Sequence, residues 1–306
     1  MDVIELTGRL KKAFNIKISP TVLISHGTIS DLSEYIEGIE GFQHSDLLVP
    51  MKSSGSQRPL FCIHSGGAHV LFYKGLGKYI HEDRPVYAIE PSHLDDDQIN
   101  VKTIDQMAEQ YISEIKKIQK SGPYFLLGTC FSNAVILEMA HQLKSVGEEI
   151  GCLYVIDSAP AYLTPPSPNG ERKPVARMLE MVRSRNWNGI SRKLNNRLTT
   201  LTRRSVHRSH AQIELNGVID ALNDMYVKYT WKPIECPIVL IRSSEFSSRS
   251  NKDFHLTRWN TLSCDSLSVR EVPGHHLTLF EEPEVRGLAQ SISDDLKVRE
   301  SGLIEV

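Results

Sequence analysis

The sequence lacks several features that would assign its 306 residues to a special class of protein. It has no apolar run of transmembrane length and no signal-peptide pattern at its start, so we expect a cytoplasmic protein with no membrane partner. Lysine and arginine (35) nearly balance aspartate and glutamate (37), and the net charge of −2 gives no reason to expect nucleic acid as a partner. We also find no internal repeat.

Cysteine pairs are missing as well. The five cysteines are odd in number, scattered and without a C-x-x-C spacing, which argues against a disulfide framework or a zinc site and leaves room for one reactive thiol. The three consecutive aspartates at 95–97 cannot all face one ion, and no matching ligands stand nearby in the sequence. The sequence therefore predicts no metal site.

A chain of this length can form one large domain and a small additional unit. From Pro59 onward, short apolar runs bounded by turn residues alternate with segments of helical periodicity. This alternation is typical of an α/β protein in which helices wrap a parallel sheet. It stops over about 162–232, where a Pro-rich stretch leads into a basic helical block. The interruption predicts a helical lid, although a solvated helical face would give the same charge pattern.

The residues ahead of this domain form a separate small unit. Residues 1–40 have helical periodicity, and Thr28 with Asp31 predicts a capped helix start. The unit is too short to bury a core of its own. Residues 41–58 are polar and contain glycine, proline and the run Ser-Ser-Gly-Ser, which predicts a linker. We therefore expect the main domain over residues 59–306.

One stretch joins a predicted strand directly to a predicted helix, the run YFLLGTCFSN at 124–133. Cys130 lies at the turn, in Gly-Thr-Cys-Phe-Ser. This follows the nucleophile-elbow pattern G-x-S-x-G, with cysteine for serine and serine for the last glycine. Such a turn exposes the nucleophile at a helix N-terminus, where the helix dipole favours a thiolate. The alternative is a buried structural cysteine.

A nucleophile of this kind needs an acid and a histidine base, which follow it along the chain in that order. Asp157 ends the next predicted strand and is the expected acid, with Glu245 after a later strand as the rival. The base is expected in the loop Gly274-His275-His276, where the residues alone do not decide between the two histidines.

An oxyanion hole needs two backbone N–H donors. One comes from the residue after the nucleophile and the other from the turn after the first strand. Phe131 and the Gly66-Gly67 turn occupy these two positions. A simple tight turn is the alternative for the two glycines.

Together these motifs resemble the thioesterase domain that ends nonribosomal peptide and polyketide synthases. The resemblance runs from about 59 to 298 apart from the lid, and its motifs are PLFCIHSGGAHVLFY, RPVYAIE, the elbow, CLYVIDSAP and VPGHHLTLFEEP. It implies an α/β-hydrolase fold with a triad of nucleophile, acid and base: Cys130, Asp157 and His276. It also implies that Gly66 and Phe131 supply the oxyanion donors.

The chain departs from that family at two places in the elbow. Most members have serine as the nucleophile, where this chain has cysteine. The residues Ser132-Asn133 replace two glycines and make the elbow more crowded.

Residues 1–40 resemble the C-terminal part of an acyl or peptidyl carrier domain. In that family a serine bearing phosphopantetheine precedes this helix, and no residue here matches it. We therefore expect a remnant that cannot be loaded and a native chain that continues upstream. An ordinary helical extension is the alternative. The resemblance implies no bound cofactor, a substrate held on the phosphopantetheine of a carrier protein, and carrier or upstream synthase modules as partners.

The expected function is that of an enzyme that releases or transfers an acyl or peptidyl chain from a carrier thioester through a Cys130 acyl-enzyme. Because cysteine would exchange one thioester for another of similar energy, the acyl group stays activated. The acyl group on Cys130 is then expected to pass either to water, which is hydrolysis, or to an amine or a hydroxyl, which includes cyclisation. A stand-alone editing thioesterase and a non-catalytic carrier-docking module are the alternatives.

Overall fold

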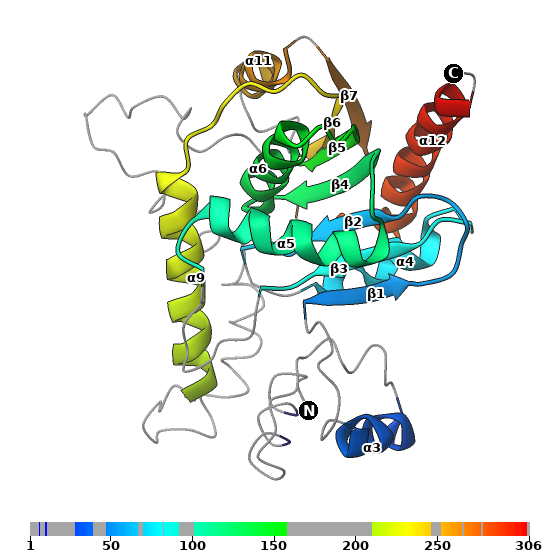
Figure 1. Ribbon diagram of the computed structural model, residues 1–306, viewed down its shortest axis with the longest axis vertical. Coiled ribbons are helices and arrows are strands. Elements are labelled where there is room, and N and C mark those ends of the chain that lie inside the picture. The colour runs from blue at the N-terminus through cyan, green and yellow to red at the C-terminus, as the bar shows by residue number, and fades with distance from the viewer. Residues whose placement is uncertain are drawn as a thin grey trace.

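The structure is a computed structural model that describes residues 6, 10, 28–38, 47–66, 70–81, 83–91, 101–157, 210–245, 252–264, 266–276 and 278–304. Within these residues a seven-stranded sheet is flanked by helices (Figure 1). The strands are β1 (Leu48–Lys52), β2 (Leu60–Ile63), β3 (Val86–Ile89), β4 (Tyr124–Thr129), β5 (Ile150–Ile156), β6 (Ile238–Ser243) and β7 (Leu267–Val272). The helices are α3 (Ile29–Gly38), η2 (Leu71–Tyr73, a 3-10 helix), α4 (Lys74–Tyr79), α5 (Ile104–Ile118), α6 (Ser132–Ser145), α9 (His210–Lys228), α11 (Lys252–Ser263) and α12 (Glu284–Ile304).

The strands follow the order β1-β3-β2-β4-β5-β6-β7. β1 pairs antiparallel with β3, and the pairings among the other strands are parallel. β4 and β6 are buried at every position, as expected for strands whose two faces are both covered by helices. The predicted α/β class with a parallel sheet is confirmed. The carboxyl ends of β2 to β7 therefore lie along one edge of the sheet.

The linker expected over residues 41–58 is corrected by the structure, because residues 48–52 form the edge strand β1. Leu47 and Val49 are buried in the core. The register of β1 shifts between Pro50 and Lys52. Proline has no backbone N–H to donate to a neighbouring strand, so it is tolerated at such an edge position. The strand is too short, and the residues after it too polar, for its pattern to stand out in the sequence.

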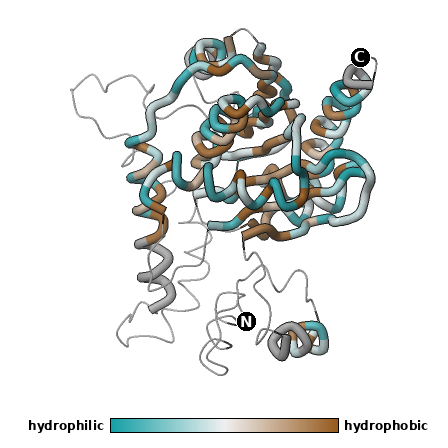
Figure 2. The backbone as a smooth tube through the Cα atoms, in the orientation of Figure 1, coloured by the Kyte–Doolittle hydropathy of each residue, from teal (hydrophilic) through white to brown (hydrophobic). Residues whose placement is uncertain are grey.

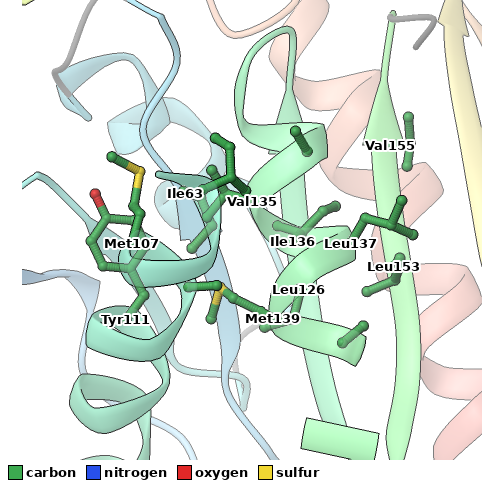
Figure 3. Packing of buried hydrophobic residues seen from close by; sticks show 14 of the residues in the cluster. Ile63, Met107, Tyr111, Leu126, Val135, Ile136, Leu137, Met139, Leu153 and Val155 are labelled. Atoms are coloured by element: carbon green, nitrogen blue, oxygen red, sulfur yellow. The ribbon is translucent and has the colours of Figure 1, made fainter. Parts of the chain in front are cut away.

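Each face of the sheet carries its own cluster of buried apolar side chains. Helices α5, α6, α9 and α11 cover one face, and η2, α4 and α12 cover the other. Figure 3 shows part of the first cluster, with Leu137 and Met139 of α6 near Leu126 of β4 and Leu153 of β5. α6 is buried along most of its length, whereas Figure 2 shows hydrophilic residues along the outer side of α5. The helix that begins at the predicted elbow is thus embedded in the core.

The predicted cap of the second N-terminal helix is confirmed. The Asp31 N–H donates to Thr28 Oγ1 at 3.1 Å, and the Thr28 N–H donates to the Asp31 carboxylate at 3.3 Å, where α3 begins. Among the described residues, no helix is both long enough and apolar enough to cross a membrane.

The predicted lid over about 162–232 lies mostly outside the described residues, which resume at α9. In α9 and the segment after it, Leu222, Tyr226 and Trp231 are buried in the first core cluster. The ring of Tyr226 contacts that of Phe131, with ring centroids 6.0 Å apart. The last part of this region therefore packs into the main domain and reaches the elbow.

The buried carboxylate of Asp295 links α12 to the sheet through hydrogen bonds. Asp295 is 5% exposed and accepts a hydrogen bond from the Tyr154 hydroxyl at 2.8 Å. It also accepts from the guanidinium groups of Arg270 at 2.7 Å and Arg299 at 2.5 Å. Removal of the carboxylate would leave these two cations without the counter-charge that they share, which is costly in a site with little water.

We expect Asp295→Ala to lower the free energy of unfolding by about 3 kcal/mol. This value is at the lower end of the usual cost of breaking a buried charge network. We choose the lower end because the Arg270 side chain is 34% exposed, so water can partly replace the lost carboxylate. The exposed neighbour Asp294 supplies the matched control, and Asp294→Ala should change the stability by less than about 0.5 kcal/mol. Urea unfolding measures both. Equal losses in the two variants would contradict this role of Asp295.

Candidate active site

Cys130 lies at a sharp turn between β4 and α6, with a left-handed backbone φ of 55°. This conformation is strained for a residue with a side chain and persists only where the surroundings fix it. The buried Ser132 hydroxyl does so, since it accepts the Thr129 N–H at 2.8 Å and donates to the Thr129 carbonyl at 2.9 Å. The strand, turn and helix predicted for the elbow are therefore present, with Cys130 at the turn.

The elbow is also as crowded as its sequence indicates. Ser132 and Asn133 are fully buried, and a Cβ atom on Gly128 would lie 2.9 Å from both the Ser132 carbonyl oxygen and Asn133 Oδ1. A side chain at position 128 would therefore displace the turn. The Asn133 amide is buried without a hydrogen-bond partner, which is unfavourable by itself.

The Cys130 thiol is protonated at neutral pH in this environment. Burial raises the pKa of the thiol from its ordinary value of 9.0 to about 11, and the Phe131 N–H, which donates to the sulfur, lowers this pKa by a smaller amount. The sequence led us to expect that the helix N-terminus would favour a thiolate. In the folded protein the loss of hydration outweighs that effect, so the thiol needs a base to remove its proton.

Asp157 follows β5 and also has a left-handed backbone, with a φ of 43°. Ser243, at the end of β6, donates its N–H to Asp157 Oδ1 at 2.6 Å and its hydroxyl to Oδ2 at 2.5 Å. The two residues meet because β5 and β6 are parallel neighbours whose carboxyl ends lie together. The predicted acid is thus held in place by two hydrogen bonds from Ser243.

His276 lies in the loop after β7, and its Nδ1 atom is 3.6 Å from Asp157 Oδ2. This separation is slightly longer than a hydrogen bond, which is common for catalytic pairs in the absence of substrate. Because Nδ1 faces the carboxylate, Nε2 is the ring nitrogen left to exchange a proton with a reacting group.

The neighbouring histidine contacts the rival acid. His275 Nε2 lies 3.4 Å from Glu245 Oε2, and the Glu245 N–H donates to the Gly274 carbonyl at 3.3 Å. The Glu245 side chain is 34% exposed, whereas that of Asp157 is fully buried. Each histidine therefore has its own carboxylate, and the pair His276–Asp157 has the buried one.

The two predicted oxyanion donors lie next to each other. A Cβ atom built on Gly66 would be 3.6 Å from Phe131 Cβ, although the two residues come from different turns. The Phe131 N–H points at the Cys130 sulfur, so it can also reach the oxygen of a carbonyl group under attack there. Gly67 lies outside the described residues.

These side chains follow β2, β4, β5, β6 and β7 and share the carboxyl edge of the sheet. A thiol, an imidazole with a carboxylate behind it and two N–H donors form the set needed for nucleophilic attack on a carbonyl carbon. Two supporting hydroxyls, those of Ser132 and Ser243, were not predicted. The only sequence feature that could have indicated Ser243 is its position at the end of a strand. In the described part of the chain, no group of three or more His, Cys, Asp or Glu side chains could hold a metal ion.

Two protein families match this chain. The family described as "Thioesterase domain" matches residues 58–296, and the family described as "Phosphopantetheine attachment site" matches residues 1–36. The first match covers the whole described sheet except β1. The second covers the segment predicted to be a carrier remnant without its attachment serine. The match identifies the carrier family but does not test whether the serine is absent, so this absence stays a prediction.

The chain is similar to parts of much longer curated proteins. A dimodular nonribosomal peptide synthase of Bacillus subtilis (strain 168) is 33% identical over 53% of this chain and 7% of its own length. Two proteins of Paxillus involutus are each 25% identical to this chain. The match covers 98% of this chain for the atromentin synthetase invA1 and 92% for the inactive atromentin synthetase invA4. The chain spans 34% and 32% of their respective lengths.

Solved structures share the fold. The NocB thioesterase domain superposes with a TM-score of 0.60 at 22% identity. The superposition covers 79% of this chain and 96% of the NocB chain. The four-domain nonribosomal peptide synthetase AB3403 gives a TM-score of 0.62 at 22% identity, over 95% of this chain and 23% of its own. The predicted α/β-hydrolase fold is confirmed by these similarities.

The raised pKa of Cys130 predicts how its alkylation depends on pH. In a Cys264→Ser background, which removes the exposed thiol, iodoacetamide should react mainly with Cys130, because the other cysteines are buried. Only the thiolate reacts. The rate should therefore rise about tenfold per pH unit from pH 7 to 10 without a plateau, since the pKa is about 11.

Cys130→Ala in the same background gives the residual reaction to be subtracted. A rate that is already at a plateau below pH 8 would contradict the neutral thiol and indicate a thiolate paired with the His276 imidazolium.

Proposed function

The chain belongs to the thioesterase domain family, and we propose that it releases or transfers an acyl or peptidyl chain from a carrier-protein thioester through an acyl-enzyme on Cys130. The observation that carries the proposal is the strained elbow at Cys130, which shares one sheet edge with the His276–Asp157 pair at 3.6 Å. Strained backbone of this kind is costly and clusters at functional sites. A structural cysteine would need neither the turn nor the pair.

Acylation begins with proton removal. His276 takes the proton from the Cys130 thiol through Nε2, and Asp157 stabilises the imidazolium that forms. The sulfur attacks the thioester carbonyl carbon, and the resulting oxyanion accepts hydrogen bonds from the N–H groups of Gly66 and Phe131. The bond to the phosphopantetheine sulfur then breaks, and His276 returns its proton to that sulfur. The acyl chain is now held on Cys130.

Deacylation runs through the same groups with a different nucleophile. His276 removes a proton from water, an amine or a hydroxyl, and the attacking atom bonds to the acyl carbon as the bond from that carbon to the Cys130 sulfur breaks. His276 then returns the proton to the sulfur and restores the neutral thiol. Because the acyl-enzyme is a thioester, it keeps the reactivity of the carrier-bound substrate. Cysteine thus suits transfer to an amine or hydroxyl, including an internal one that closes a ring, as well as hydrolysis.

The substrate is proposed to arrive on the phosphopantetheine of a carrier domain. The match of residues 1–36 to the carrier family, directly ahead of the thioesterase match, supports this partner. So does the similarity to synthases of which this chain spans only a part. The segment over about 162–232 is proposed as the lid of the site, and its last residues contact Phe131 through Tyr226 at 6.0 Å.

Formation of an acyl adduct tests the proposal. After incubation with an acyl-N-acetylcysteamine thioester, intact-protein mass spectrometry should show one added acyl group on the Cys264→Ser protein and none on Cys130→Ala in that background. The exposed Cys264 is removed because an exposed thiol exchanges with thioesters without catalysis.

The choice of acid is tested in the same assay. Asp157→Asn should slow adduct formation by about a hundredfold or more, and Glu245→Gln much less, because only Asp157 faces His276. If wild type and Cys130→Ala remain equally unmodified with several acyl chains while Cys130 still reacts with iodoacetamide, the domain is a non-catalytic module.

Cys130→Ser should change the products rather than abolish acylation. A serine variant forms an oxygen ester, which is less reactive toward amines than a thioester. In the presence of a fixed amine concentration, the ratio of amide to free acid should therefore fall at least several-fold relative to wild type. Liquid chromatography of the products gives this ratio, and an unchanged ratio would remove the chemical reason proposed for the cysteine.

A further inference from the structure

A fully buried histidine lies directly behind the proposed oxyanion hole. His64 follows β2 and precedes the Ser65-Gly66 turn. Its Nδ1 atom is 2.8 Å from the carbonyl oxygen of Ser65, and its Nε2 atom is 2.8 Å from the hydroxyl of Tyr111 on α5. Figure 3 shows Tyr111 among the buried side chains of α5, beside Met107. The ring therefore links the turn that carries Gly66 to a rigid helix of the core.

The partners of His64 fix which nitrogen carries a proton. A carbonyl oxygen can only accept a hydrogen bond, so Nδ1 must be the donor to Ser65. In the neutral ring Nε2 is then the acceptor, and the Tyr111 hydroxyl donates to it. Tyr111 is itself fully buried, and its pKa is raised by burial and by the charge of Glu90. Its hydroxyl is therefore available as a donor at any physiological pH.

The same ring also packs on the second oxyanion donor. The His64 and Phe131 rings are stacked, with centroids 5.6 Å apart and an angle of 27° between their planes. Phe131 carries the N–H that points at the Cys130 sulfur. One imidazole thus contacts both turns, the first through a hydrogen bond to Ser65 and the second through a ring face.

We propose that His64 is the positioning residue of the oxyanion hole: its Nδ1–H sets the Ser65-Gly66 turn and its ring sets Phe131, so that both N–H donors face the same oxygen. The proposal rests on the proposed function. It differs from an ordinary buried histidine in one consequence, because loss of His64 should impair reactions that form an oxyanion at Cys130 and spare those that do not.

Two substitutions separate the two contacts. His64→Asn places an amide nitrogen near the position of Nδ1, so it retains the donor to the Ser65 carbonyl and loses the ring. His64→Phe retains a ring on Phe131 and loses the donor. His141→Asn is the matched control, because His141 lies on α6 and its Nε2 atom contacts the Lys232 carbonyl at 3.2 Å.

Two reactions of the same thiol supply the readout, both in the Cys264→Ser background. Acylation by the N-acetylcysteamine thioester passes through a tetrahedral oxyanion. Alkylation by iodoacetamide displaces iodide at a saturated carbon and forms none. We expect His64→Phe to slow acylation about 10- to 100-fold. The alkylation rate should stay within about two-fold of wild type, because no oxyanion is involved.

His64→Asn should also slow acylation, by a smaller factor than His64→Phe, because it keeps the donor to Ser65 and loses only the ring contact with Phe131. His141→Asn should change neither rate. Tyr111→Phe, which keeps its ring in the core, should shift acylation in the same direction as His64→Phe by a smaller factor. It serves as the test if the His64 variants fold poorly.

The outcomes distinguish the two proposals. If wild type acylates and the His64 variants lose acylation and alkylation in equal proportion, or lose neither, His64 has no positioning role and the proposed function stands. If wild type forms no acyl adduct, the proposed function fails and the role of His64 fails with it.

Discussion

The left-handed backbone at Cys130 is the constraint on which the candidate site depends. A non-glycine residue in this conformation costs on the order of 1–3 kcal/mol, so it persists only because β4 and α6 are both buried in the core and leave the chain no other path. The Ser132 hydroxyl closes the turn from inside by bonding to both the N–H and the carbonyl of Thr129. The position of the thiol is therefore set by the packing of the whole sheet rather than by local preference.

The other candidate site residues lie at the same edge of the sheet, which explains why some could be predicted and others could not. Cys130 and Asp157 were predicted because a change from strand to helix periodicity, or a strand end, is visible in a single stretch of sequence. Ser243 was not, because its role depends on β6 lying beside β5, and that pairing joins segments far apart in the chain. β1 was missed for a related reason. A short strand containing Pro50 has no pattern of its own and is defined by its pairing with β3.

The protonation state of Cys130 shows where a local rule fails. A helix N-terminus favours a thiolate by a fraction of a pKa unit or more, but the burial of the sulfur favours the neutral thiol more strongly. The single N–H of Phe131 only partly offsets the lost water. A neutral thiol resists unwanted alkylation and oxidation, and in the proposed mechanism its reactivity depends on His276 as the base.

The two adjacent histidines show how burial separates roles that the sequence alone leaves equivalent. Both have a carboxylate within 3.6 Å, so proximity does not decide between them. The Glu245 side chain is partly exposed, whereas that of Asp157 is fully buried and accepts two hydrogen bonds from Ser243. The histidine proposed as the base is therefore His276, whose Nδ1 faces the carboxylate that is buried and fixed. The His275–Glu245 contact has a different effect. Together with the hydrogen bond from the Glu245 N–H to the Gly274 carbonyl, it holds the loop against the end of β6 and so helps to position His276.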